Sequence, residues 1–371
     1  MLEPDAAEPL VDVIVAVHSA ARPVERAVHS VLAGTAARVR VTVVCHGLPS
    51  DEIAAKLGAD AVDARVRLVE LVDGLRSPSG VFNRGFELAT GRFTSIMGSD
   101  DELEPGAIDS WLAVQARDDA DVVIPRLRFA GGAVVPTPAV RPFRGSRLDA
   151  VRDRLAYRSA PLGLVSRARF GELRLQPGLR NGGDIDYATR MWTSGARISY
   201  DGDGPAYLIH DDAGDRVTLE PKPLADELAS VRLLAEQDWL AAKPAAVRRA
   251  VAVKLLRIHV FGAAYYRRDL AEWSAADRAA MRDTVRTCLA LAPGCERVLA
   301  RADRALLDAL LAGDAAASEL SRLAVARRRF PAPATLVPRR LDALLAREAP
   351  LRFAAASVLV RGRRARTRSR V

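Results

Sequence analysis

The sequence is poor in cysteine and in aromatic residues, and it has no long apolar run. Its three cysteines, Cys45, Cys288 and Cys295, are too few for a disulfide scaffold and have no metal-binding partners at suggestive spacing, so a reducing compartment fits. No run approaches the ~18 apolar residues of a membrane span. The first residues also lack the basic-then-apolar pattern of a secretory signal. We therefore expect a cytoplasmic protein that has neither a membrane span nor a secretory signal.

What remains is a globular composition with an uneven charge. The chain has 371 residues, of which 49% are apolar and 27% charged, enough for a sizeable core and most simply for two domains. Residues 220–371 hold 29 basic and 16 acidic residues, a net charge of +13, whereas residues 1–219 hold 26 and 30, a net charge of −4. The overall charge of +9 therefore belongs to the second half.

Residues 1–219 alternate β-rich runs with helical patterns. Buried strands are expected at 11–17, 39–45, 66–72, 93–97 and 121–125, and helices at 22–32, 51–57, 78–89, 105–117, 148–157 and 184–194, with short strands at 197–200 and 206–209. This βαβα series predicts an α/β domain with a mainly parallel sheet. Ligands of such sheets usually bind at the carboxyl ends of the strands.

The pattern after the boundary at residues 219–223 is helical only. Helices are expected at 224–240, 245–266, 275–291, 297–312 and 317–329, which predicts an all-α domain over residues 220–360. Residues 361–371 are rich in arginine and have no apolar periodicity, so we expect a basic disordered tail.

The segment 83–106 contains the most informative chemistry. Two adjacent carboxylates, Asp100 and Asp101, follow an apolar strand and precede a helix. Carboxylate oxygens bind Mg²⁺ or Mn²⁺, whose coordination is commonly completed by substrate phosphates. The alternative is that the pair only caps the following helix, and for an isolated Asp-Asp pair this alternative is favoured.

The context of the pair favours the metal site. The segment from Asn83 to Gly106 resembles the Asn-x-Gly-x-x-x-Ala-x-Gly…Asp-Asp-x-x-x-Pro signature of family 2 inverting glycosyltransferases with the GT-A fold. The segment 183–195 is similar to the family's Glu-Asp motif at a helix start, and 207–210 to a strand end that can present a metal-binding histidine. The resemblance covers residues ~11–218 and implies a Rossmann-like GT-A domain, 1–219.

The resemblance also implies roles for individual residues. Asp101 would bind the metal that bridges the diphosphate of a nucleotide sugar, and Asp100 would contact the ribose or the metal shell. Asp184 would be the general base that deprotonates the acceptor hydroxyl. His210 is either a further metal ligand or a satisfied histidine at a strand end. Arg216 is either a diphosphate contact or a surface arginine without a role.

Some positions depart from the family pattern. His18 and His46 stand where the family usually has other residues, and they would line the nucleotide pocket together with Asn83 of the signature. Gly98 stands where an additional Asp is often found, and Gly183 replaces the Glu before the presumed base. These departures keep two alternatives open: a degenerate GT-A domain that binds glycan or assembles partners, and a nucleotidyltransferase, whose Gly-rich basic loop is missing here.

The predicted function is a metal-dependent inverting glycosyltransferase that uses Mn²⁺ or Mg²⁺. Its partners would be a nucleotide-diphosphate sugar and a glycan or lipid-linked acceptor of a bacterial surface polysaccharide. The basic tail would contact anionic lipid at the inner membrane face, with a solubilising tail as the alternative. Aromatic residues make up 5% of the chain and do not interleave with the arginines, so we expect no nucleic-acid partner. Oligomer formation through the helical domain is left open.

Overall fold

The chain folds into two compact units. The computed structural model describes residues 8–75, 77–132, 135, 140–210, 212, 222–270 and 272–368, with side chains up to residue 359. Met1–Pro136, Gly145–Leu148 and Ala160–Glu220 form the first unit, and Thr137–Arg144, Asp149–Ser159 and Pro221–Val371 form the second. The predicted boundary at residues 219–223 contains Pro221, where the long segment of the second unit begins. Two shorter segments from the first half of the chain also belong to the second unit.

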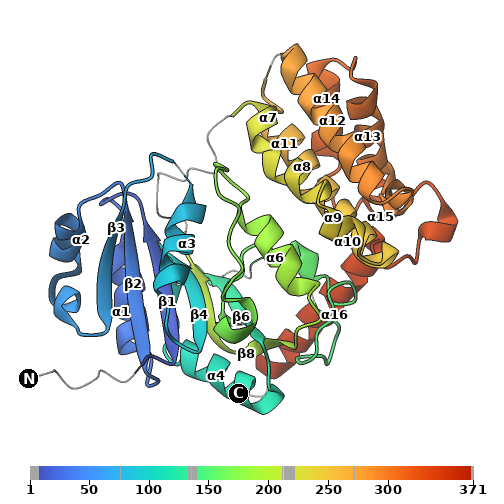
Figure 1. The fold of residues 1–371 in the computed structure, drawn as a ribbon. Helices are drawn as coiled ribbons and strands as arrows, with labels where there is room; N and C mark the ends of the chain where they lie inside the picture. Colours follow the sequence, from blue (N-terminus) through green and yellow to red (C-terminus); the bar gives the residue numbers. More distant parts are fainter. Residues whose placement is uncertain are drawn as a thin grey trace, which may run out of the picture. The chain divides into compact units, whose positions relative to one another are not determined.

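The first unit is built on one eight-stranded sheet (Figure 1). Its strands are β1 (Val11–Val17), β2 (Val39–His46), β3 (Val66–Leu71), β4 (Phe93–Gly98), β5 (Glu102–Leu103), β6 (Val122–Phe129), β7 (Leu164–Ser166) and β8 (Ile198–Ile209), and its helices are α1 (Val24–Ala33), α2 (Ser50–Leu57), α3 (Pro78–Leu88), α4 (Ala107–Asp118), α5 (Arg167–Phe170) and α6 (Asp184–Trp192). The strand order is β3-β2-β1-β4-β7-β6-β8-β5. All pairs are parallel except those of β7 with β4 and β6 and of β5 with β8. The predicted α/β architecture with a mainly parallel sheet is confirmed.

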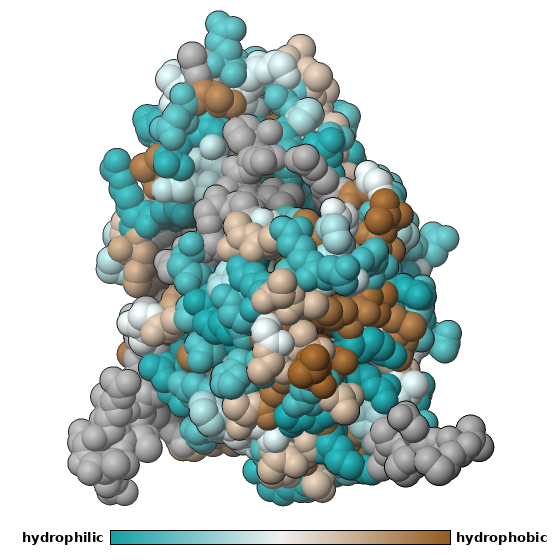
Figure 2. All heavy atoms as spheres, turned by 90° about the vertical axis from the view of Figure 1, so that its left-hand side faces the viewer, coloured by the Kyte–Doolittle hydropathy of each residue, from teal (hydrophilic) through white to brown (hydrophobic). Residues whose placement is uncertain are grey.

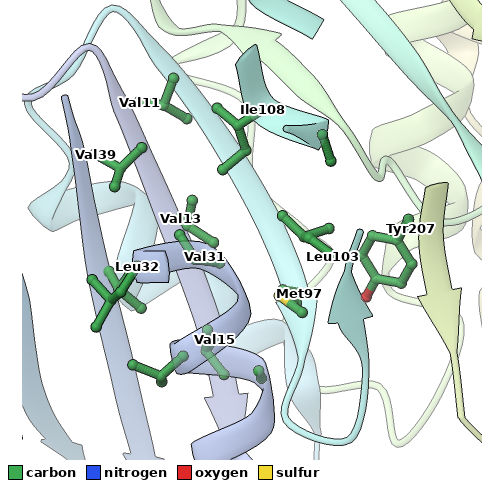
Figure 3. Close-up of a cluster of buried hydrophobic side chains, with 14 of the residues drawn as sticks. Val11, Val13, Val15, Val31, Leu32, Val39, Met97, Leu103, Ile108 and Tyr207 are labelled. Atoms are coloured by element: carbon green, nitrogen blue, oxygen red, sulfur yellow. The ribbon is translucent and has the colours of Figure 1, made fainter. Parts of the chain in front are cut away.

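The side chains of β1 point alternately to the two faces of the sheet, and they are buried on both faces. Val11, Val13 and Val15 belong to a large apolar cluster that includes residues of α1, α2 and α4 (Figure 3). Ile14, from the opposite face, packs in a smaller cluster with α3. A Cβ at Gly85 of α3 would come within 2.2 Å of the Ile14 side chain. The Gly of the Asn-x-Gly signature therefore allows α3 to lie directly on β1.

Two helix predictions are wrong in detail. Residues 148–157 contain only a short 3₁₀ turn at Leu155–Tyr157. Asp153 there accepts hydrogen bonds from the backbone N–H groups of Arg141 and Asp149, and Arg154 has a left-handed φ of 57°, which interrupts a helix. The segment predicted as one helix at 224–240 forms three short ones instead.

The second unit is helical, as predicted. Its helices are α7 (Leu224–Glu227), α8 (Ala229–Ala235), α9 (Asp238–Ala241), α10 (Ala245–Lys254), α11 (Phe261–Tyr266), α12 (Ala275–Leu291), α13 (Arg301–Ala312), α14 (Ala317–Ala326), α15 (Pro333–Leu336) and α16 (Pro350–Arg368), and a π-type turn, Leu255–Val260, joins α10 to α11. Helix α16 enters the segment for which the sequence predicts no regular structure, because alanine and arginine are strong helix formers. Within the described residues, no helix meets the length and hydropathy that a membrane span requires.

A network of buried charges joins distant segments of the second unit. Asp303 forms ion pairs with Arg327 at 2.9 Å and with Arg257 at 3.4 Å. Arg257 also donates to the carbonyl of Glu348 at 2.7 Å and lies 3.5 Å from the Tyr157 hydroxyl. Buried guanidinium groups require such partners, because an unpaired buried charge is costly. The network therefore fixes the segment 149–159 in this unit.

The surface has the mixed character of a globular protein. On the face turned to the viewer in Figure 2, hydrophilic residues predominate and apolar residues gather in small patches. Isolated apolar residues on a surface are usual.

Candidate active site

The register of the parallel strands brings three predicted site segments to one edge of the sheet. Ala16 of β1 lies beside Gly98 of β4, and Val17 lies beside Cys45 of β2. The residues at the carboxyl ends of these strands therefore lie next to one another. These are His46, the last residue of β2, and His18 and the pair Asp100 and Asp101, which follow β1 and β4. This is the edge at which open α/β sheets usually bind ligands.

Asp101 is held by hydrogen bonds from β8. The Tyr207 hydroxyl donates to Asp101 Oδ2 at 2.6 Å and accepts a hydrogen bond from the Gly98 N–H at 3.2 Å. The backbone N–H of His210 lies 3.3 Å from Asp101 Oδ1. Figure 3 shows the Tyr207 ring beside Leu103, within the apolar cluster. The buried tyrosine thus orients the carboxylate from inside the core.

The electrostatic state of Asp101 is unusual for a carboxylate. Its pKa is raised from 3.8 to about 6, mainly by burial; the hydrogen bond from Tyr207 opposes this rise, and the negative charge of Asp100 contributes to it. Burial and the neighbouring Asp101 also raise the pKa of Tyr207 well above its ordinary value. No lysine or arginine in the described part of the chain forms an ion pair with Asp101. A cation bound here would supply the missing positive charge.

Asp100 differs from its neighbour because it already has a cationic partner. Arg22, from the turn after β1, lies 2.9 Å from Asp100 Oδ1, and both side chains are about nine-tenths buried. Arg26 of α1 donates to the backbone carbonyl of Asp100 and forms a bidentate pair with Asp212 at 2.8 and 3.2 Å. The two adjacent carboxylates therefore differ: an arginine neutralises Asp100, whereas none of the described arginines pairs with Asp101.

His210 lies beside Asp101 at the end of β8. Its Nε2 atom is 3.1 Å from Glu102 Oε2, and its Nδ1 atom is 3.9 Å from Asp212 Oδ2. Antiparallel pairing of β5 with β8 places Glu102 opposite Leu208 and so produces this contact. The histidine is thus within an acidic group of side chains, where its imidazole is available as a metal ligand or as a hydrogen-bond partner.

At the ends of β2 and β3, His46 pairs with Asp73. His46 Nε2 lies 2.7 Å from Asp73 Oδ1, and the Leu75 N–H donates to the same oxygen at 2.9 Å. Burial alone would raise the pKa of Asp73, but the hydrogen bonds from His46 and Leu75 lower it below its ordinary value. His18 is exposed at the end of the neighbouring strand. The prediction of the nucleotide pocket from the sequence missed Asp73, which follows β3 and lies beside His46 at the end of β2.

Asn83 has a structural role. Its side-chain amide donates to the carbonyl of Leu175 at 2.9 Å and accepts from the Leu175 N–H at 2.8 Å. These bonds hold the loop before α6 against α3, and Phe86 stacks on Tyr187 with ring centroids 5.8 Å apart. The predicted contact of Asn83 with the donor stays a prediction.

The same packing explains why Gly183 replaces a glutamate. A Cβ at Gly183 would lie 2.1 Å from Ser79 Oγ and 2.8 Å from the carbonyl oxygen of Gln176. The glycine is therefore required by the close approach of α6 to α3. Asp184, the first residue of α6, is half-buried next to this contact. Because Ser79 lies in the first turn of α3, which follows β3, Asp184 is near the carboxyl edge of the sheet.

Arg216 and Gly98 are the remaining two positions that the sequence analysis singled out. Arg216 lies outside the described residues. At Gly98, a Cβ would come within 2.8 Å of Asp101 Oδ2 and 3.0 Å of Asp100 Oδ1. The missing side chain at Gly98 thus leaves room for the two carboxylates.

Part of the chain is similar in sequence to known proteins. Residues 12–171 match the model of the glycosyl transferase family 2. The chain is 35% identical over 133 residues to the succinoglycan biosynthesis protein ExoO of Rhizobium meliloti (strain 1021), which covers 33% of this chain and 37% of that protein. The chain thus spans well under half of the length of this curated relative.

Solved structures show the same fold. The crystal structure of S. aureus TarS 1-349 in complex with UDP-GlcNAc superposes with a TM-score of 0.69 at 17% identity, over 86% of this chain and 91% of that chain. The complex of TarS 1-349 with UDP gives a TM-score of 0.66 over the same shares. The expected GT-A fold is therefore confirmed. Residues 12–171 thus match glycosyltransferase family 2, as the resemblance in the sequence predicted, and this match together with the fold supports a glycosyltransferase.

Several residues of the site have no signal in the sequence. Arg22 lies 78 positions before Asp100, and Tyr207 lies 106 positions after Asp101. Only the fold brings them together. The position of Tyr207 in the strand that precedes His210 is the one feature that could have pointed to it.

Proposed function

We propose that this glycosyltransferase transfers a sugar, with inversion and with the help of Mn²⁺ or Mg²⁺, from a nucleotide-diphosphate sugar to a hydroxyl group of a polysaccharide or glycolipid precursor. The observation that carries the proposal is Asp101, a partly buried carboxylate at the carboxyl edge of the sheet that forms no ion pair with a lysine or arginine among the described residues. Its neighbour Asp100 is paired with Arg22. Asp101 is therefore the carboxylate that would take a divalent cation.

The donor atoms at this position fit such a cation. Within the described residues no group of three or more His, Cys, Asp or Glu side chains is arranged around one metal position. Mg²⁺ commonly takes only one or two carboxylates from the protein and the rest from substrate phosphates and water. Asp101 and His210 would hold the cation on the protein side, and Asp100 would support them. When bound, the cation would neutralise charge on the leaving diphosphate.

Asp184 would act on the acceptor. An acceptor oxygen attacks the anomeric carbon from the face opposite the diphosphate, and the bond between this carbon and the diphosphate oxygen breaks. The nucleoside diphosphate leaves with the bonding electrons, and Asp184 takes the proton of the hydroxyl. A single displacement of this kind inverts the anomeric centre. The position of Asp184 at the start of α6, near the strand ends, supports this role.

The nucleotide would lie over the ends of β1 to β3. His46 and Asp73 form a hydrogen-bonded pair there, and His18 is exposed beside them. TarS, which shares the fold, was crystallised with UDP and UDP-GlcNAc. We therefore propose a uridine nucleotide as the first donor to test. Arg216 is proposed as a diphosphate contact on sequence grounds.

A thermal-shift panel tests the donor and the cation together. Nucleoside diphosphates and nucleotide sugars are compared with and without Mn²⁺. A ligand at 100 times its Kd stabilises the folded state by about 2.7 kcal/mol. We expect one base to be preferred and its shift to require Mn²⁺. Equal shifts without the metal would contradict metal dependence.

Substitution of Asp184 tests the base. Asp184→Asn should abolish sugar transfer and leave the Mn²⁺-dependent shift by the nucleoside diphosphate unchanged. Asp186→Asn is the matched control, because Asp186 lies on the same helix and pairs with Arg190 at 2.7 Å. Transfer that persists in Asp184→Asn would reject the assignment.

The acceptor and the place of action are proposed from the sequence. A lipid-linked or glycan acceptor at the inner membrane face agrees with the name of the relative ExoO, a succinoglycan biosynthesis protein. Deleting residues 361–371 should weaken binding to anionic vesicles and leave donor hydrolysis intact. Unchanged vesicle binding would reject a membrane role for the tail.

A further inference from the structure

The second unit carries a pocket lined by arginines. Its volume is about 200 Å³, and Glu296, Arg297, Leu299, Arg304, Arg339 and Arg340 line it. Four guanidinium groups therefore face one carboxylate. Arg297 is exposed and forms no ion pair within the described residues. The pocket thus offers positive charge that the protein itself does not fully neutralise.

Two exposed leucines follow the last two arginines of this pocket. Leu341 is 69% exposed and Leu345 is 70% exposed. They are four residues apart, and a short 3₁₀ turn, Leu341–Ala343, begins at the first of them. Among the described residues, no part of the chain buries these two large apolar side chains. They gain stability only when another apolar phase covers them.

The existing partners of the arginines do not prevent another anion from binding. Arg339 pairs with Asp308 at 2.7 Å, and Arg340 pairs with Asp342 at 2.9 Å. These four side chains are between 38% and 64% exposed, and exposed pairs contribute only about 0–1 kcal/mol each. A phosphate that approaches the surface can therefore replace them.

We propose that the surface formed by Arg297, Arg339, Arg340, Leu341 and Leu345 binds an anionic lipid membrane, with lipid phosphates at the arginines and the leucines in the interface. Charge complementarity selects this occupant, since four of the six residues that line the pocket are arginines and one is a carboxylate. The leucines distinguish a lipid surface from a nucleic acid or a soluble polyanion, which offer no apolar phase. This surface is separate from the basic tail, and the inference goes beyond the sugar transfer proposed above.

The test is co-sedimentation of the full chain with two kinds of vesicle. One contains phosphatidylglycerol mixed with phosphatidylcholine, and the other contains phosphatidylcholine alone. We expect binding to the first only, and we expect it to weaken with salt. Each basic residue near an anionic surface contributes about 1 kcal/mol. Arg339→Gln with Arg340→Gln should therefore lower the partition coefficient about thirtyfold.

The leucine variant separates lipid insertion from charge. Leu341→Ser with Leu345→Ser keeps every charge and should lower vesicle binding about tenfold or more, because two apolar side chains no longer enter the interface. Both residues are exposed, so the fold is retained. Leu233→Ser, at a residue 41% exposed on α8, should have little effect. Vesicle binding that is unchanged in the double leucine variant overturns the proposal.

A matched charge control excludes a general effect of net charge. Arg286→Gln with Arg322→Gln removes the same charge from α12 and α14, where both side chains are 65% exposed. We expect less than a threefold loss of binding. A loss equal to that of the Arg339 and Arg340 variant overturns the assigned location. Thermal shift by the nucleoside diphosphate is measured in every variant, so that failure of the donor site is distinguished from failure of this surface.

Discussion

Replacing Asp101 with asparagine should stabilise the metal-free protein at neutral pH. The folded protein raises the pKa of this carboxyl from 3.8 to about 6, mainly because it is buried. Between these two values the folded state binds a proton that the unfolded state has released. Stability contributed by the protonated form is therefore complete below pH ~4 and is lost as the pH rises through about 6. Asparagine carries no charge at any of these values.

The expected size follows from the shift in pKa. A change of about two units corresponds to about 3 kcal/mol, which is the extra cost of the ionised carboxylate in the folded state above pH 6. Asparagine can still accept the hydrogen bond from Tyr207, but its amide faces the His210 N–H, which costs about 1 kcal/mol. The variant should thus be about 2 kcal/mol more stable than the parent protein at pH 7.5 and slightly less stable at pH 4.

Urea denaturation at several pH values measures this difference. The quantity to compare is the free energy of unfolding of the variant minus that of the parent, which should increase by about 3 kcal/mol between pH 4 and pH 7.5. Added Mn²⁺ should stabilise the parent and not the variant. If the difference is independent of pH, Asp101 does not carry the buried charge, and the reason given for cation binding fails.

Further substitutions and one chemical probe test the packing. Gly85→Ala should destabilise the first unit by about 1–3 kcal/mol in urea denaturation, because the new methyl group overlaps the Ile14 side chain. Gly131→Ala, which meets no atom within 4 Å, is the neutral control. Gly262→Ala, in helix α11 and with open space for a Cβ, should stabilise by about 0.5–1 kcal/mol; a loss would refute this. Alkylation at pH 8 should spare Cys45, because burial raises its thiol pKa to about 11, and reaction before unfolding would contradict its burial.

The sequence predicted regular elements well where local pattern and burial agree. The bounds of β1 and α12 match their predicted ranges, because β1 is a valine-rich central strand and α12 begins at a capping serine, Ser274. The two-residue β5 and the three-residue β7 were missed. Such short strands form only because a neighbouring strand already offers hydrogen-bonding partners.

The site was predicted in outline and missed in its partners. The signature motifs pointed to Asp100, Asp101 and His210 but could not show that, among the residues described, an arginine pairs with Asp100 and none pairs with Asp101. That difference depends on Arg22 in the turn after β1. The role of Asn83 was also not readable, because its two bonds to Leu175 cross 92 residues. Contacts between segments that are distant in the sequence decide how the site side chains are paired and oriented. Such contacts cannot be predicted from local sequence patterns.

The membership of the segment 149–159 in the second unit has a consequence for how the chain can be divided. A truncated chain that ends near residue 220 would retain Tyr157 but lose Arg257 and Phe353, two side chains that Tyr157 contacts. We expect such a fragment to expose more of this partly buried ring and to aggregate. During synthesis on the ribosome, the same segment emerges long before Phe353 does. It must wait for nearly two hundred further residues before its partners exist, which makes this stretch a natural target for a chaperone.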